Sequence, residues 1–96
     1  MKLPKHFNIF GKKIKIKKVD LGAQYLGMYY PGKNLININS SITDESELDH
    51  TLIHEFIHSV IDRCSLNQVV TYPSEEVLVD MITKALLENF QIKSKG

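Results

Sequence analysis

The hydrophobic pattern of this chain changes its period once, near Ser40. Before that point, polar and apolar residues alternate over Lys12–Val19 and Leu35–Asn39, as they do in strands with one buried face. After it, apolar residues recur three and four positions apart, which is typical of helices that pack on a core. A run of strands followed by a run of helices predicts an α+β fold.

The first part of the chain predicts three strands, which we expect to form an antiparallel sheet. Their ranges are Lys12–Val19, Gln24–Tyr30 and Leu35–Asn39, and we expect irregular chain before the first strand. The residues Pro31-Gly32-Lys33-Asn34 predict a turn between the second and third strands. Proline fixes its own φ, and glycine accepts the positive φ that such turns need.

The second part of the chain predicts two main helices packed on this sheet. The first begins after Thr43 as N-cap and ends near Arg63 or Cys64. Its apolar positions cover more than half of its circumference, so we expect a central helix that is packed on several sides. The second helix begins at about Ser74, its expected N-cap. Its apolar stripe comprises Val77, Leu78, Met81, Ile82, Ala85, Leu86 and Phe90.

Length and composition narrow the class of protein. With 96 residues, of which 43% are hydrophobic, the chain can form one core, and we expect a single domain over residues 1–96. Its one cysteine, Cys64, excludes an intramolecular disulfide. No apolar run approaches the roughly 18 residues that cross a bilayer, and Met1–Ile9 lacks the apolar core of a secretory signal. These features predict a cytoplasmic protein with no membrane partner.

Charge is distributed unevenly along the chain. Residues 1–33 contain eight lysines and one acidic residue, whereas residues 34–96 contain four basic and ten acidic residues. A basic segment can bind nucleic acid or another polyanion. However, Lys13, Lys15 and Lys17 alternate with isoleucines, which is also the pattern of the solvent face of a strand. The solvent-face interpretation is favoured, and nucleic acid stays a partner hypothesis.

The most informative motif is His54-Glu55-Phe56-Ile57-His58, an H-E-x-x-H sequence within the first predicted helix. Two histidines four residues apart lie on one helix face, so both rings can bind a single tetrahedral metal ion. Glu55 lies about 100° around the helix from His54, where it can contact a metal-bound water without binding the ion. This is the position of a general base in water-promoted hydrolysis. The competing interpretation is a pair of histidines with only a structural role.

A catalytic zinc needs a third protein ligand, and the candidates are Glu75 and Glu76 at the start of the second helix. We favour Glu76, because Asp80 then lies one turn further along and can accept the second ring N–H of a ligand histidine, His54. Glu75 stays open as the alternative ligand. Both glutamates can also serve simply as first-turn acids that favour the helix dipole.

Three other residues with metal-binding side chains are assigned no ligand role. His50 lies four residues before His54, but about 12 Å of helical rise separates it from His58, which is too far for both to bind one ion. We expect His50 to line the cleft or to lie exposed near the helix start. His6 has no partner in the sequence, and Cys64 points away from the histidine face.

The sequence His54-Glu55-x-x-His58 followed by Glu76-x-x-x-Asp80 resembles the gluzincin pattern of zinc metallopeptidases. The compact layout is similar to minimal zincin domains of bacteria and their phages, such as the ImmA/IrrE-like and SprT-like groups, over roughly residues 25 to 90. The chain departs from the family pattern by having Glu75 in place of an asparagine and by lacking a second domain. The resemblance implies that the edge strand before the active-site helix binds extended peptide. In this chain that strand comprises Leu35, Ile36, Asn37, Ile38 and Asn39.

The sequence supports two functions from different classes. The first is a zinc-dependent metallopeptidase in which His54, His58 and Glu76 hold Zn²⁺, and Glu55 takes a proton from the metal-bound water that attacks a peptide bond. Tyr72, before the second helix, is the candidate for stabilising the oxyanion. The alternative is a non-catalytic adaptor or DNA-associated module, stabilised by zinc, that uses the basic strand as its contact surface. Structural zinc sites favour cysteine, of which the chain has only one, so the peptidase is favoured.

Overall fold

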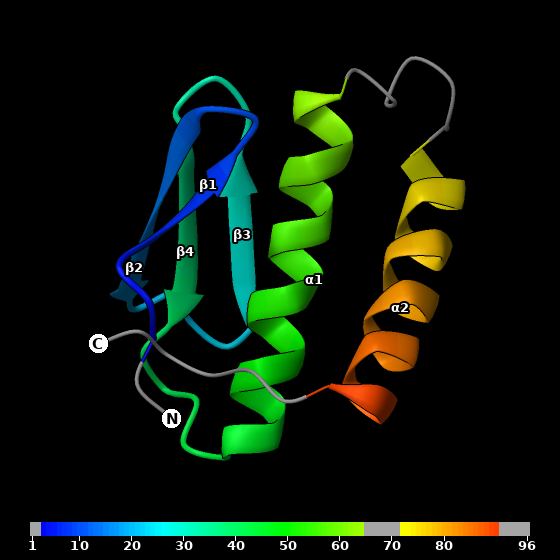
Figure 1. Ribbon diagram of the computed structural model, residues 1–96. Coiled ribbons are helices and arrows are strands. Elements are labelled where there is room, and N and C mark those ends of the chain that lie inside the picture. The colour runs from blue at the N-terminus through cyan, green and yellow to red at the C-terminus, as the bar shows by residue number, and fades with distance from the viewer. Residues whose placement is uncertain (1–2, 65–71, 91–96) are drawn as a thin grey trace.

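The computed structural model describes residues 3–64 and 72–90, with the backbone alone for Tyr72 and Pro73. Its described part contains four strands followed by two helices, so the expected α+β class is confirmed (Figure 1). The strands are β1 (His6–Ile9), β2 (Lys12–Val19), β3 (Gly27–Tyr30) and β4 (Leu35–Asn39). The helices are α1 (Glu45–Arg63) and α2 (Tyr72–Asn89).

The sheet is mixed, with the strand order β1-β2-β4-β3. β2 pairs parallel with β4, while β1 and β3 pair antiparallel on the two outer sides. The expectation of three antiparallel strands is therefore wrong in the number of strands and in the direction of one pair. The additional strand forms because Phe10 and Gly11 both have positive φ, 49° and 80°, and turn the chain back into a hairpin.

The parallel pair follows from the path of the chain after β2. The chain first forms β3 at the outer edge of the sheet and then reverses through residues 31–34 into β4. The predicted turn is thus confirmed, and the backbone N–H of Lys33 donates to the carbonyl of Tyr30 at 3.2 Å. Because the chain reverses at this turn, β4 runs in the same direction as β2 and fits between β2 and β3.

One face of the sheet forms the main core with α1. Ile14, Ile36 and Ile38 are fully buried on this face, and Leu52 of α1 is fully buried against them. The alternation read from the sequence therefore identifies the buried positions of β2 and β4.

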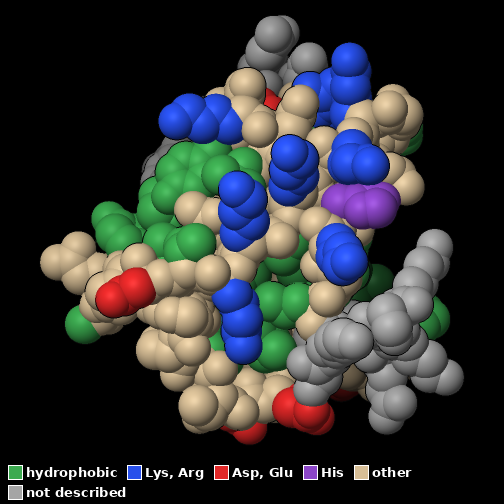
Figure 2. Space-filling view, turned by 90° about the vertical axis from the view of Figure 1, so that its left-hand side faces the viewer, with side chains coloured by type: hydrophobic (Ala, Val, Ile, Leu, Met, Phe, Trp, Pro, Cys, Tyr) green, Lys and Arg blue, Asp and Glu red, His purple; other side chains and the backbone are tan. Residues whose placement is uncertain are grey.

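The opposite face of the sheet is basic, and neither of the described helices covers it. Lys13, Lys15 and Lys17 alternate with the buried isoleucines of β2 and are exposed, as the solvent-face interpretation predicts. Figure 2 looks onto this side of the molecule and shows basic side chains, in blue, gathered over it. Both helices lie on the other side of the sheet (Figure 1).

The helix α1 lies between the sheet and α2, which confirms its expected central position (Figure 1). Asp44 rather than Thr43 caps its N-terminus, because the Asp44 carboxylate accepts a 3.1 Å hydrogen bond from the backbone N–H of Glu47. α2 runs antiparallel to α1 and begins at Tyr72, two residues before the expected cap Ser74. Neither described helix combines the length and the hydrophobicity that crossing a membrane requires.

The apolar stripe predicted for α2 is present, but it is not the buried face of the helix. Val77, Met81 and Phe90 are 62%, 64% and 67% exposed. Instead, α2 buries Val79 and Thr83 completely, with Val79 joining a small apolar cluster on α1. The helix is therefore rotated so that its most polar turn, rather than its stripe, faces the motif on α1.

Candidate metal centre

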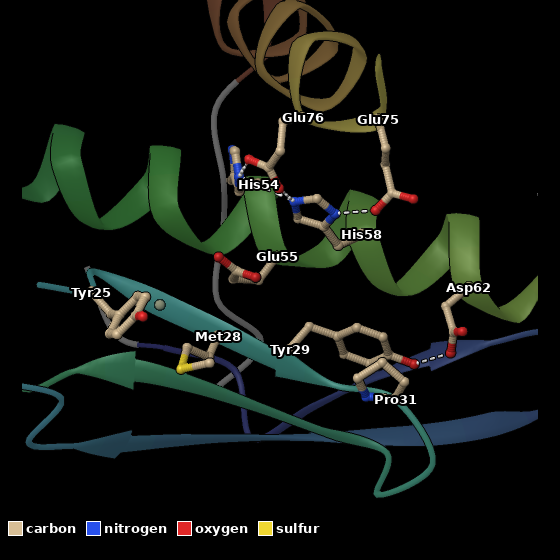
Figure 3. Close-up of a pocket in the computed structure, with 11 residues that line it drawn as sticks. Tyr25, Met28, Tyr29, Pro31, His54, Glu55, His58, Asp62, Glu75 and Glu76 are labelled. Carbon is tan, nitrogen blue, oxygen red and sulfur yellow. Dashed lines mark hydrogen bonds and ion pairs between the residues drawn. The ribbon is translucent and has the colours of Figure 1, made fainter. Parts of the chain in front are cut away.

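His54, Glu55 and His58 lie on α1 where this helix meets both α2 and the edge strand β3 (Figure 3). Glu75 and Glu76, near the start of α2, face the two histidines across the helix pair. A pocket opens between these side chains and the residues of β3. The H-E-x-x-H motif and both candidates for the third ligand therefore line one pocket.

The three expected ligand residues, His54, His58 and Glu76, converge on one point. The Nε2 atoms of the two histidines are 3.2 Å apart. Glu76 lies 2.9 Å from His58 Nε2 through Oε1 and 3.6 Å from His54 Nε2 through Oε2. A tetrahedral zinc ion with bonds of about 2.0–2.1 Å needs ligand atoms about 3.3 Å apart. The spacing of these atoms therefore fits a tetrahedral ion.

Glu75 contacts His58 from its other side. Glu75 Oε2 lies 2.6 Å from His58 Nδ1, and the two side chains are 14% and 12% exposed. When Nδ1 carries the proton, the neutral ring presents a lone pair at Nε2, toward the Glu76 carboxylate and His54. Negative groups and lone pairs at this distance repel one another unless a cation lies between them. The donor set thus fits a metal ion, and the competing arrangement, an imidazolium between two glutamates, requires a charged His58.

His54 is biased toward its neutral form. Burial lowers the pKa of His54, and the neighbouring His58 lowers it further, against the opposing effect of Glu76. Only a neutral imidazole can bind a metal ion, so this shift favours metal binding near neutral pH.

Glu55 lies on the side of α1 that faces β3 and is only 8% exposed. Burial raises the pKa of its carboxyl to about 7, and the nearby Glu76 charge acts in the same direction. His58 and a hydrogen bond from the backbone of Tyr29 oppose this rise. A carboxyl whose pKa is near neutrality can both accept and release a proton at physiological pH, as a general base must.

Gly27 of β3 lies tightly against α1. A Cβ atom at this position would lie 2.8 Å from Thr51 Cγ2 and 3.1 Å from Glu55 Cγ, closer than side chains normally pack. The missing side chain therefore lets the backbone of β3 reach Glu55. Gly27 was not identified from the sequence as part of the site, and a glycine inside a strand is the signal that could have revealed it.

Two further residues hold β3 and the chain before it in place, a role that was not predicted from the sequence, where Asn39 was expected to bind substrate. The Tyr29 hydroxyl donates a 2.6 Å hydrogen bond to Asp62 Oδ2 on α1. Burial and this bond raise the pKa of Tyr29 well above its ordinary value, so its proton stays in place. Asn39, which is 2% exposed, donates through Nδ2 to the carbonyls of Gly22 and Tyr25 at 2.9 and 2.7 Å. The first bond ties β3 to α1, and the other two tie the chain before β3 to the end of β4.

Asp80 lies one turn beyond Glu76, as expected, but pairs with different residues. Its Oδ1 lies 3.7 Å from His50 Nε2, and its Oδ2 lies 3.0 Å from Lys84 Nζ. The contact that we expected from Asp80, with the second ring nitrogen of a ligand histidine, is made by Glu75 instead. Sequence spacing alone could not assign these two acids, because their roles depend on how α2 is rotated.

The strand expected to bind substrate, Leu35–Asn39, is not an edge strand. It forms β4, whose two sides pair with β2 and β3, so its backbone has no free side for a peptide. The edge strand beside α1 is β3, and Gly27, Met28 and Tyr29 of this strand line the pocket. The side chain of Tyr72, the candidate for stabilising the oxyanion, lies outside the described residues.

Comparison with known proteins identifies no family for this chain. No family model matches it, and no curated protein or solved structure matches it with significance. The function must therefore be argued from the pocket itself.

Proposed function

We propose that this chain is a zinc-dependent metallopeptidase with a minimal zincin-like fold. The observation that carries the proposal is the convergence of His54, His58 and Glu76, whose ligand atoms are 2.9 to 3.6 Å apart. Glu55 adds a buried carboxyl with a raised pKa on the same pocket. Three metal ligands and a general base beside an open pocket are the components of water-promoted amide hydrolysis.

Each of these residues has a defined task in the proposed reaction. When bound, zinc supplies a Lewis acid that lowers the pKa of water and polarises a substrate carbonyl. Glu55 accepts a proton from the attacking water and then donates it to the leaving amine nitrogen. The pKa of about 7 belongs to the metal-free site, since a nearby cation favours the carboxylate form of Glu55. Glu75 holds His58 in the orientation in which Nε2 faces the ion.

An extended peptide is the substrate that suits the open side of the pocket. β3 is an edge strand, so one row of its backbone N–H and C=O groups lacks a partner strand. A peptide that pairs with this edge lies alongside Glu55 and the two histidines. Met28 and the half-exposed Tyr25 line the same pocket and offer apolar contacts to the side chains of the peptide.

Metal analysis and hydrolysis of an unfolded protein such as casein test the proposal. The purified chain should bind one zinc ion tightly, and hydrolysis should stop when zinc is chelated and resume when zinc is restored. Glu55→Gln should retain zinc while hydrolysis falls by roughly 10²- to 10⁴-fold, because the general base is lost. Glu47→Gln is the matched control. Glu47 lies exposed on the same helix, so this substitution should change neither zinc binding nor hydrolysis.

Two results would contradict the proposal at different points. Protein that binds no zinc even when zinc is in excess would exclude the metal site. Zinc-loaded Glu55→Gln that hydrolyses casein as fast as the parent would exclude the proposed general base.

A second function is favoured by one specific observation, the basic face of the sheet. Lys13, Lys15 and Lys17 are exposed in a row along β2, and Lys15 pairs with His6 on β1. In this alternative, zinc only stabilises the fold, and the lysine row binds the phosphates of a nucleic acid.

Fluorescence anisotropy with single-stranded DNA at two salt concentrations tests the alternative. Replacing the three lysines with glutamine should weaken binding and reduce its salt dependence. One result would favour the binding module over the peptidase. The zinc-loaded protein would bind DNA through these lysines and would show no hydrolysis that a chelator stops.

A further inference from the structure

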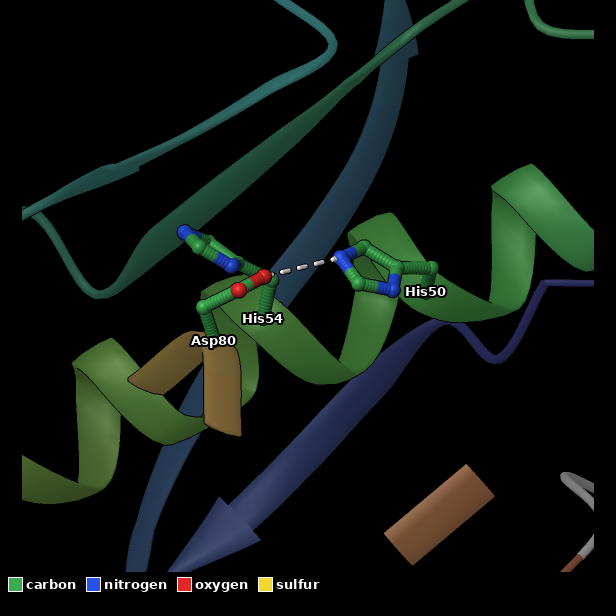
Figure 4. Close-up of side chains that lie close together, drawn as sticks. All are labelled: His50, His54 and Asp80. Carbon is green, nitrogen blue, oxygen red and sulfur yellow. Dashed lines mark ion pairs between the residues drawn. The ribbon is translucent and has the colours of Figure 1, made fainter. Parts of the chain in front are cut away.

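The pairing of two histidines with a carboxylate is repeated one helical turn from the metal centre. His50 and His54 are four residues apart on α1, as His54 and His58 are. Asp80 lies four residues after Glu76 on α2. Because the two helices run antiparallel, the turn of α1 that precedes the metal centre lies opposite the turn of α2 that follows it. Asp80 therefore faces the upstream pair of histidines (Figure 4).

The side chains of this second group already lie within reach of a common ion. One ligand atom from each of His50, His54 and Asp80 lies within 4.8 Å of the others. His50 Nε2 is 3.7 Å from Asp80 Oδ1, and the rings of His50 and His54 are stacked with centroids 6.1 Å apart. Lys84 contacts the other carboxylate oxygen, Oδ2, and thus leaves Oδ1 directed toward His50.

We propose that His50, His54 and Asp80 form a second position for zinc or a similar divalent cation. Two imidazoles and one carboxylate are a ligand set that binds Zn²⁺ well. The second position shares His54 with the first. The inference requires that the interface of α1 and α2 binds a cation, as the proposed function does, but it requires no hydrolysis.

The second position should bind its ion more weakly than the first. The two carboxylates are similarly exposed, Asp80 at 41% and Glu76 at 40%, but His50 is 37% exposed whereas His58 is 12% exposed, so more histidine side-chain freedom is lost when an ion binds at the second position. Glu75 also fixes the ring of His58 and raises its basicity as a ligand. At the second position an ion must instead compete with Lys84 for Asp80.

The two positions exclude each other because both need His54. A neutral imidazole has one nitrogen with a free lone pair, so it binds one ion at a time. The more exposed position is the one that an ion from solution meets first. The parent chain therefore binds one ion tightly and not two.

Zinc titrations against a competing chelator test the second position in a variant that lacks the first. His58→Gln removes the first position and keeps a donor for Glu75. We expect this variant to bind one zinc ion more weakly than the parent, and the added substitution His50→Ala to abolish that binding. His6→Ala is the matched control, because it removes an exposed histidine on β1 and should leave the weak binding unchanged. Circular dichroism establishes that each variant is folded.

The outcomes separate this inference from the proposed function. Suppose that the parent binds zinc tightly. A folded His58→Gln variant that binds no zinc, or that binds zinc equally well after His50→Ala is added, would then contradict the second position and leave the proposed function standing. A parent that binds no zinc overturns both proposals, and a parent that binds two ions overturns the exclusion. If His58→Gln does not fold, the same comparison is made with Glu76→Gln, whose side chain is 40% exposed in the parent.

Discussion

The helix α1 presents two chemically different faces to its neighbours. Toward the sheet it packs Leu48 and Leu52 into a cluster of buried isoleucines. Toward α2 it presents His54 and His58 to carboxylates, beside a smaller apolar cluster around Val79. The first contact gains stability from buried apolar area, whereas the second depends on polar groups that need one another or a cation.

The second contact leaves much of the apolar stripe of α2 on the outside. Val77 and Met81 are 62% and 64% exposed, while Thr83 in the same helix is fully buried. Hydrophobic packing alone would rotate α2 so that its stripe met α1. The observed rotation directs Glu75 and Glu76 to the histidines instead. In the observed orientation, α2 makes the polar contacts and leaves much of its apolar stripe exposed.

The largest effect on stability is expected at the apolar contact. Leu52→Ala should lower the free energy of unfolding by about 2–5 kcal/mol, because Leu52 is fully buried and alanine leaves a cavity. Leu86→Ala on α2 is the matched control, since Leu86 is 37% exposed and its loss should cost clearly less. Urea denaturation followed by circular dichroism measures both. Equal losses would mean that burial does not determine the cost of removing a leucine side chain from this fold.

The next effect concerns Glu55, which lies where the two contacts meet. Its pKa rises from 4.5 to about 7 in the folded chain, so folding favours the protonated carboxyl. The stability from this group is full below about pH 4.5 and is lost as the pH rises to about 7. The loss should be about 1.4 kcal/mol for each unit of pKa difference.

Urea denaturation of the chelator-treated chain across this pH range measures the effect. Glu55→Gln is the control, because glutamine fills the same space and does not titrate. The difference between the two pH profiles isolates the contribution of Glu55 from that of every other titrating group. Parallel profiles would mean that Glu55 is hydrated in the metal-free chain.

The apolar contact is also the part of the fold that the sequence predicts best. The bounds of β2 and β4 match the alternating segments, because alternation directly reflects which side chains the sheet buries. The parallel pairing of these strands could not be predicted, since periodicity identifies a buried face and not a neighbouring strand. β1 has only four residues, and Ile9 is the one that it buries, so it carries almost no periodic signal.

At the candidate metal centre, the sequence predicts which residues converge better than it predicts their contacts. His54 and His58 have a fixed relation within one helix, and Glu76 does join them. Whether Glu75 or Asp80 contacts a ligand ring depends on the rotation of α2. This rotation could not be predicted, because the apolar stripe that normally indicates the buried face of a helix is exposed here. The role of Gly27, to let β3 pack closely against α1, can be recognised only when the position of β3 beside α1 is known.

Glu75→Ala tests whether the polar contact holds a ligand in place. It removes the acceptor that lies 2.6 Å from His58 Nδ1, so zinc affinity should fall by roughly 10- to 100-fold. Asp80→Ala is the matched control on the same helix, since Asp80 contacts His50 and Lys84, and the tight affinity should persist. Chelator competition titrations rank the two variants. A greater loss from Asp80→Ala would restore the arrangement expected from the sequence, in which Asp80 orients His54.

The smallest effect is expected on the exposed side of α2. Met81→Gln should change the free energy of unfolding by no more than about 0.5 kcal/mol, because Met81 is 64% exposed and glutamine is a good helix former. Urea denaturation at two protein concentrations, about tenfold apart, is the measurement, because a second copy of the chain on this face would make stability depend on concentration. A larger loss that grows with concentration would show that the stripe is buried between chains in solution. The observed rotation of α2 would then allow both a polar contact with α1 and an apolar contact with a second copy of the chain.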